Sequence, residues 1–93
     1  MSAWRVVWRP LAIDDLRAVV RFIGQDNPAR AHTFGDELRQ QMHALEQFPE
    51  RGRAGRIKGT RELVLHPNYI GFYRVDVERH AVEILRIKHA RRR

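Results

Sequence analysis

Residues 49–65 read PERGRAGRIKGTRELVL, and this stretch separates a helical pattern before it from a run of strand patterns after it. Its cations fall within eleven positions and are Arg51, Arg53, Arg56, Lys58 and Arg61. Glycines recur among them at positions 52, 55 and 59, so little of the stretch can be buried. We predict a basic loop that faces a partner and ends where Thr60 and Arg61 enter a strand. Composition alone equally allows a solvated linker.

Before this loop, the sequence predicts one strand and the first of two helices. Residues 3–9 alternate, with Trp4, Val6 and Trp8 on one face, which is typical of a strand. We interpret the tryptophans as packing of the sheet rather than as a base-stacking platform. Pro10 ends the strand and suits the first position of a helix.

The first helix should end near Gly24. Asp14 and Asp15 fall near its start, where the helix dipole favours acids. Adjacent helical residues diverge by about 100°, so we do not interpret the two carboxylates as an acid–base pair.

The second helix has the clearest local signal, because Asn27 is a favoured N-cap and Pro28 a favoured first helical residue. Gly35 costs about 1 kcal/mol relative to Ala in a helix, unless it allows close approach to the first helix. The link at 25–27 is so short that the helices should form an antiparallel hairpin. An apolar stripe runs to Pro49, which ends the helix: Ala31, Phe34, Leu38, Met42, Leu45 and Phe48.

After the basic loop, strand patterns occupy residues 61–65, 69–77 and 81–89, and short turns between them favour an antiparallel meander. Residues 90–93 form a basic tail. The order β-α-α-β-β-β predicts a single α+β domain over residues 1–93. In it, the helical hairpin packs on a small, mainly antiparallel sheet.

Composition limits the expected partners. The 93 residues carry a net charge of +7, almost all of it from arginine. Arginine presents a planar fork to phosphate or carboxylate. The expected partners are therefore nucleic acid, an enzyme that acts on nucleic acid, or an acidic protein.

Other functions are excluded or not expected. The absence of cysteine excludes disulfides, Cys-ligated zinc and thiol catalysis. No histidine has metal-ligand spacing with another histidine or a carboxylate, so we expect no metal and no cofactor. No apolar run approaches the roughly 18 residues of a membrane span, and no signal-peptide core is present, so we expect a cytoplasmic protein.

Several short motifs occur in a fixed order along the chain. They include Asn27-Pro28, Gly52-Arg53, Gly59-Thr60-Arg61-Glu62-Leu63, Tyr73-Arg74-Val75 and Ile84-Leu85-Arg86-Ile87, followed by His89. Taken in this order, nearly end to end, the chain resembles the ParE/RelE superfamily of bacterial toxins. It is more similar to the ParE, or plasmid-stabilisation, branch than to the RelE branch.

The resemblance implies a growth-inhibiting toxin that an antitoxin neutralises with an acidic, amphipathic C-terminal segment. ParE-like members poison DNA gyrase, and RelE-like members cut mRNA on the ribosome. We favour gyrase binding, without a catalytic residue of the toxin's own. The predicted target contacts are Arg53, Arg56, Lys58, Arg61, Arg86, His89, Arg91, Arg92 and Arg93. The predicted antitoxin contacts rim an apolar groove along the helical hairpin and are Arg17, Arg21 and Arg39.

Two alternatives remain open. In a RelE-like nuclease, Arg61 and Arg86 would hold phosphate and His89 would be the acid or base. We interpret His89 instead as a structural or partner-facing residue. The third hypothesis is a small basic nucleic-acid-binding module, which the charge permits but no recognised motif supports.

Overall fold

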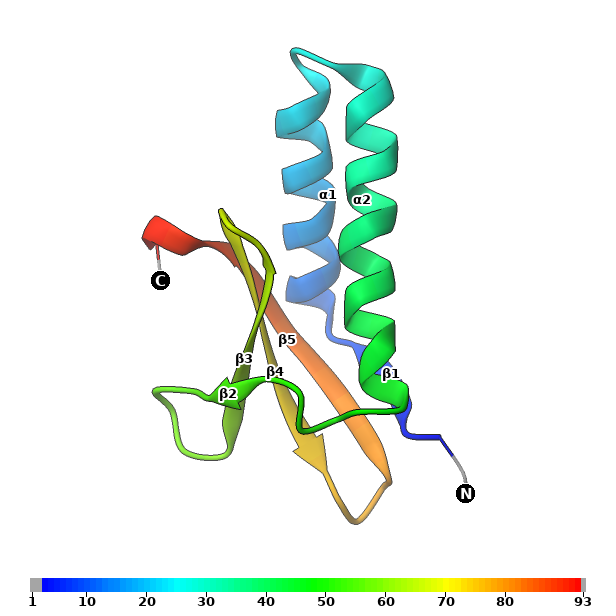
Figure 1. Ribbon diagram of the computed structural model, residues 1–93, viewed down its shortest axis with the longest axis vertical. Coiled ribbons are helices and arrows are strands. Elements are labelled where there is room, and N and C mark those ends of the chain that lie inside the picture. Colours follow the sequence, from blue (N-terminus) through cyan, green and yellow to red (C-terminus); the bar gives the residue numbers. More distant parts are fainter. Residues whose placement is uncertain (1–2, 93) are drawn as a thin grey trace.

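The computed structural model describes residues 3–92 and places two α-helices on one side of a five-stranded sheet (Figure 1). The predicted β-α-α-β-β-β order is confirmed, with one additional two-residue strand, β2. The elements are β1 (Arg5–Trp8), α1 (Pro10–Gly24), α2 (Pro28–His43), the 3₁₀ helix η1 (Ala44–Glu46), β2 (Arg53–Ala54), β3 (Thr60–His66), β4 (Tyr69–Asp76), β5 (Ala81–His89) and the 3₁₀ helix η2 (Ala90–Arg92).

The sheet is mixed, with the strand order β1-β5-β4-β3-β2. Strand β1 runs parallel to β5, and all other neighbours are antiparallel, as the predicted meander requires. Strand β1 pairs with β5 only as far as Ile84, and α1 also packs against β5. The backbone N–H of Ile87, beyond this pairing, donates to the Asp15 carboxylate of α1 at 2.9 Å. The end of β5 therefore borders a helix.

The helix starts follow from local chemistry. Pro10 begins α1, and the Asn27 side chain caps α2 by accepting a hydrogen bond from the Arg30 backbone N–H at 3.0 Å. The first turn of α1 contains no acidic residue, so the prediction that Asp14 and Asp15 serve the helix start is wrong. These two residues lie one turn too far along the helix.

The predicted end of α2 is also wrong. The α-helix stops at His43, a 3₁₀ turn follows, and the Phe48 side chain is 65% exposed rather than part of the buried stripe. The other predicted stripe residues are buried. The 3₁₀ turn explains the difference, because three residues per turn rotate the chain away from the 3.6-residue period.

The core lies between the helical hairpin and the sheet face that it covers. It includes Leu16, Phe34, Leu38 and Ile84. The predicted close approach of the helices occurs at Gly35, where an added Cβ would lie 2.8 Å from Cγ2 of Val20. Trp8 of β1 and Trp4 just before it pack partly buried against this core, which confirms their interpretation as sheet packing.

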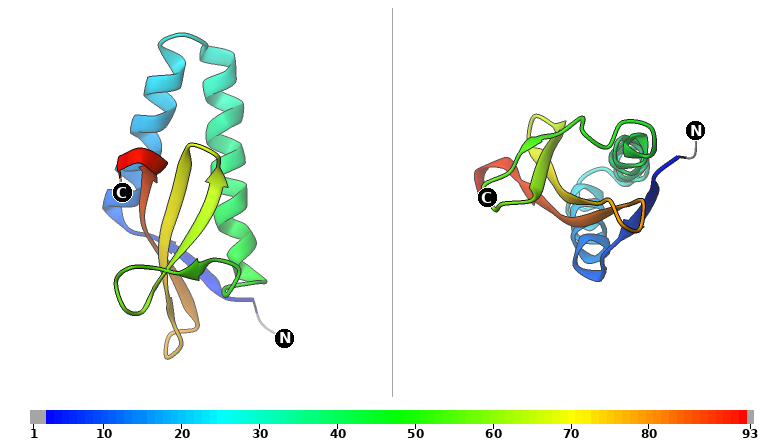
Figure 2. Two further views of the ribbon diagram at one scale, coloured as in Figure 1. Left: turned by 60° about the vertical axis from the view of Figure 1, so that its left-hand side comes forward. Right: turned by 90° about the horizontal axis from the view of Figure 1, so that it is seen from below.

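The basic loop is more ordered than predicted. Residues Arg53 and Ala54 pair with Glu62 and Arg61 of β3, so part of the predicted loop is an edge strand. Figure 2 shows the segment that follows β2 away from the helices, and the C-terminal η2 beside the β3–β4 turn. The Ala90 N–H donates to the Asn68 carbonyl at 2.8 Å, which holds η2 there. Among residues 3–92, no helix is long and apolar enough to cross a membrane.

Candidate partner-binding surfaces

The end of β5 and one flank of α1 line a pocket of about 740 Å³, which we call the β5 pocket. Its β5 and η2 wall carries Arg86, Lys88, His89 and Arg91. Its α1 wall is apolar apart from the Asp15 carboxylate. The structure therefore brings three predicted target residues together: Arg86, His89 and Arg91.

The charge of Arg86 is largely neutralised inside this pocket. Its Nε donates to Oδ2 of Asp15 at 2.7 Å, and its NH2 donates to Oδ1 at 3.1 Å. These hydrogen bonds are the largest cause that raises the pKa of Arg86 above its usual value. Asp15 also accepts a hydrogen bond from the backbone N–H of Ile87, so it satisfies a donor at the end of β5 that has no strand partner in β1. Two-point pairing of this kind fixes a guanidinium in one orientation.

His89 has one ring nitrogen occupied. Its Nδ1 accepts a hydrogen bond from the Arg91 backbone N–H at 3.2 Å, and its ring packs edge-on against Tyr69 with 5.3 Å between centroids. Because Nδ1 is the acceptor, the neutral imidazole carries its proton on Nε2. In this arrangement Nε2 can donate a hydrogen bond, and neither ring nitrogen is free to accept a proton while the Arg91 contact is intact.

Arg61 lies outside the β5 pocket. Its NH1 donates to the backbone carbonyl of Gly52 at 2.7 Å and, at 3.4 Å, to that of Glu50. The residue therefore binds the start of the basic loop to β3. The three residues of the alternative nuclease site do not converge, because Arg86 and His89 share a pocket that Arg61 does not line.

Tyr73 is the second anchor of the same loop, a role that its sequence context does not indicate. Its hydroxyl accepts the Gly52 N–H at 2.8 Å and donates to the Pro49 carbonyl at 2.7 Å. The side chain is fully buried, and burial, the largest cause, raises its pKa above the usual value. Tyr73 lies directly across from Arg61 in the sheet. Only the strand register reveals this pairing, so no local sequence signal could have found it.

Three further predicted target residues, Arg53, Arg56 and Lys58, do not line the β5 pocket. Arg53 pairs with the buried Glu62 at 3.3 Å. Arg56 and Lys58 are exposed in the segment between β2 and β3. The backbone of Arg92 belongs to η2, and Arg93 lies outside the described residues.

A second surface, which we call the hairpin groove, follows the other flank of α1. It has a volume of about 600 Å³, and Trp8, Ile13, Leu16 and Val20 form its apolar lining. Arg17, Arg21, Arg39 and His43 also line it. Arg39 pairs with Asp36 at 2.9 Å, whereas Arg17 and Arg21 form no side-chain hydrogen bond or ion pair with residues 3–92. The structure thus gathers all three predicted antitoxin contacts around one apolar groove.

Comparison with known proteins identifies related sequences over nearly the whole chain. A family model described as "ParE toxin of type II toxin-antitoxin system, parDE" matches residues 6–93. The chain is 39% identical to "Toxin RelE2" of Caulobacter vibrioides over 88 residues, which cover 95% of this chain and 97% of that protein. It is 38% identical to "Putative toxin Y4kP" of Sinorhizobium fredii, over 97% of this chain and 92% of the relative.

Solved structures share the fold. The chromosomal ParDE toxin–antitoxin system of P. aeruginosa matches with a TM-score of 0.85 and 24% identity, over 94% of this chain and 96% of the other. The RelBE2 toxin–antitoxin complex of Mycobacterium tuberculosis matches with a TM-score of 0.63 and 26% identity, over 96% and 93% of the two chains. Relatives therefore carry both ParE and RelE names, and the names alone do not select a target.

Proposed function

Because this chain belongs to the ParE toxin family of type II toxin–antitoxin systems, we propose that it inhibits growth by binding and poisoning DNA gyrase in the cytoplasm. In this proposal the toxin has no catalytic site of its own, and a cognate antitoxin neutralises it. The main support is the ion pair between Asp15 and Arg86. An RNA-cleaving site in the β5 pocket would need Arg86 free to bind phosphate, but the Asp15 carboxylate already binds it.

Metal-free RNA cleavage needs a base for the 2′-hydroxyl, a free cation for the phosphate, and an acid for the leaving oxygen. Arg86 is paired with a carboxylate, and Arg61 is bound to loop carbonyls elsewhere. The Nδ1 atom of His89 accepts a backbone N–H, which leaves the ring without a free basic nitrogen. This arrangement favours a surface that contacts a partner over one that cleaves RNA.

The second candidate function is a ribosome-dependent mRNA endonuclease. Its support is the grouping of Arg86, Lys88, His89 and Arg91 in one pocket. For cleavage, Arg86 would have to break its pair with Asp15, and His89 would have to break its hydrogen bond with the Arg91 backbone, when the ribosome binds. Such a change is compatible with known enzymes, in which catalytic hydrogen bonds often form only once the substrate is bound.

The hairpin groove is the proposed antitoxin site. An acidic, amphipathic segment could place apolar side chains against Trp8 and Val20 and carboxylates beside Arg17 and Arg21. Helix-in-groove binding of this kind is a common mode of peptide recognition. The two solved relatives described above are toxin–antitoxin assemblies, which supports an antitoxin partner for this family member.

The proposal is tested by inducing the toxin in bacteria with and without its antitoxin, and by following plasmid supercoiling and mRNA integrity in the same cultures. We expect loss of supercoiling or broken DNA before any mRNA cleavage, and rescue by the antitoxin. Early, site-specific mRNA cleavage with normal supercoiling would reject the gyrase proposal in favour of the nuclease.

A further inference from the structure

A turn at residues 48–51 follows η1 and forms part of the wall of a hollow of about 600 Å³. The Arg51 N–H donates to the Phe48 carbonyl at 3.1 Å, which closes the turn. Pro49 occupies the second position, where its fixed backbone angle favours β-turns. We call this segment the 48–51 turn.

The 48–51 turn is held from behind by hydrogen bonds from the side chains of β4 and β3. The Tyr73 hydroxyl donates to the Pro49 carbonyl, and Arg61 donates to the Glu50 carbonyl. Gly52, just after the turn, lies so close to the sheet that an added Cβ would be 2.7 Å from the Glu62 carbonyl oxygen. The turn cannot move away from β3 and β4 without breaking these contacts.

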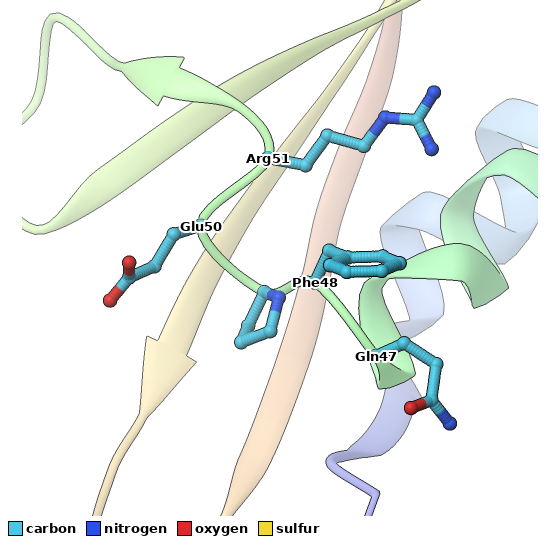
Figure 3. A pocket seen from close by; sticks show the side chains of 5 residues that line it. Gln47, Phe48, Glu50 and Arg51 are labelled. Atoms are coloured by element: carbon cyan, nitrogen blue, oxygen red, sulfur yellow. The ribbon is translucent and has the colours of Figure 1, made fainter.

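This rigid support presents an aromatic side chain and a cation together. Figure 3 shows the side chains of Phe48 and Arg51 on one side of the chain and the Glu50 carboxylate on the other. Phe48 is 65% exposed. The Arg51 side chain makes no hydrogen bond or ion pair with the rest of residues 3–92.

We propose that Phe48 and Arg51 form a protein-docking contact that binds an apolar site beside a carboxylate on the toxin's target. This inference rests on the proposed function and locates its contact surface. Exposed aromatic and arginine side chains on a fixed backbone are the usual anchors of protein interfaces, since little entropy is lost when they bind. An acidic partner site would complement Arg51 and the net charge of +7 that the chain carries.

A protein fits this surface better than RNA or DNA. A phosphate backbone is bound by rows of cations, whereas the residues that line this hollow include one arginine and one carboxylate, Arg51 and Glu50. The 48–51 turn and the hairpin groove share no lining residue. Substitutions in the turn should therefore separate target binding from antitoxin binding.

The test uses the whole chain described here with Phe48→Ala and Arg51→Glu, and measures affinity for gyrase, for the antitoxin and for RNA by calorimetry. Matched controls are Val77→Ala, an exposed apolar residue, and Arg79→Glu, which makes the same charge change in the β4–β5 turn. We expect each turn variant to lose about tenfold or more in gyrase affinity. Antitoxin affinity and thermal midpoint should stay unchanged, and Phe48→Leu should restore part of the binding.

Three outcomes overturn the inference. If both turn variants bind gyrase as tightly as the wild type does, the 48–51 turn is not the gyrase contact, and the proposed function is unaffected. Failure of the wild type itself to bind gyrase would reject the proposed function and this contact with it. Loss of RNA binding, with gyrase binding unchanged, would assign the turn to nucleic acid instead.

Discussion

At the scale of single residues, two polar contacts, one buried and one partly buried, determine what the surfaces can do. The Tyr73 hydroxyl satisfies both a donor and an acceptor of the basic loop, and the Asp15 carboxylate satisfies both Arg86 and the edge of β5. Tyr73 fixes the basic loop and Asp15 fixes the end of β5, two segments that are predicted to bind a partner. Their loss should therefore be visible first in stability and then in binding.

Tyr73→Phe should lower the free energy of unfolding by about 1–3 kcal/mol, because the Gly52 N–H and the Pro49 carbonyl lose their partner. The raised pKa of Tyr73 adds a pH dependence. The unfolded state ionises first as the pH rises above about 10, so the stabilisation by Tyr73 should be complete below that pH and be lost above it. Urea denaturation of the wild type and of Tyr73→Phe from pH 7 to 11 measures the free energy of unfolding of both proteins. If the difference between these two free energies does not shrink at high pH, the predicted pH dependence is wrong.

Asp15→Asn should destabilise the fold by about 1 kcal/mol, because a charge-assisted pair becomes a neutral hydrogen bond and the pair is partly exposed to solvent. Asp14→Asn, the matched control on the neighbouring exposed position, should change stability by less than about 0.5 kcal/mol. Guanidinium unfolding of the two variants gives the comparison. Equal effects would mean that the Arg86 pair contributes nothing measurable.

At the scale of elements, the helices and long strands were predictable, and the exceptions have physical causes. Asn27 and Pro28 fixed the start of α2, but nothing in the sequence marks the change to a 3₁₀ turn that exposes Phe48. Strand β2 has two residues and exists only because β3 pairs with it. An element this short has no periodicity to detect.

The same limit applies to the candidate sites. The helical spacing of Arg17 and Arg21, one turn apart, was enough to predict that they would line one groove. The contacts of Arg61 depend on the register that places it opposite Tyr73, which the sequence does not encode locally. The roles of all these residues in binding stay predictions.

The basic loop gives an element-scale prediction. Arg61→Ala should speed amide exchange of Gly52 about fivefold to tenfold, because two carbonyls that hold the loop lose their donor. Arg56→Ala, which removes an exposed cation of the same loop, should leave this exchange unchanged. Hydrogen exchange followed by NMR resolves the single amide. Unchanged exchange in Arg61→Ala would return Arg61 to the list of free target contacts.

At the scale of the whole molecule, helix α1 separates two surfaces. One flank lines the hairpin groove through Ile13, Leu16 and Val20, and the other lines the β5 pocket through Val19 and Phe22. An antitoxin segment in the groove would leave the β5 pocket and the 48–51 turn uncovered.

Arg17→Glu combined with Arg21→Glu should weaken antitoxin binding at least about tenfold, because repulsion replaces two attractive charges beside the groove. The wild-type affinity should fall as salt rises, and that of the variant should fall less. Arg5→Glu combined with Arg9→Glu, exposed positions that do not line the groove, provides the charge-matched control. Equal antitoxin affinity of the two double variants would place the antitoxin elsewhere.

The most direct test of the central proposal uses purified toxin, gyrase, ATP and plasmid DNA, with supercoiling and cleaved DNA followed on a gel. We expect inhibition or trapped cleavage of DNA that the antitoxin reverses and that Arg51→Glu weakens. Unaffected gyrase, with toxin that still cuts mRNA on purified ribosomes, would contradict it.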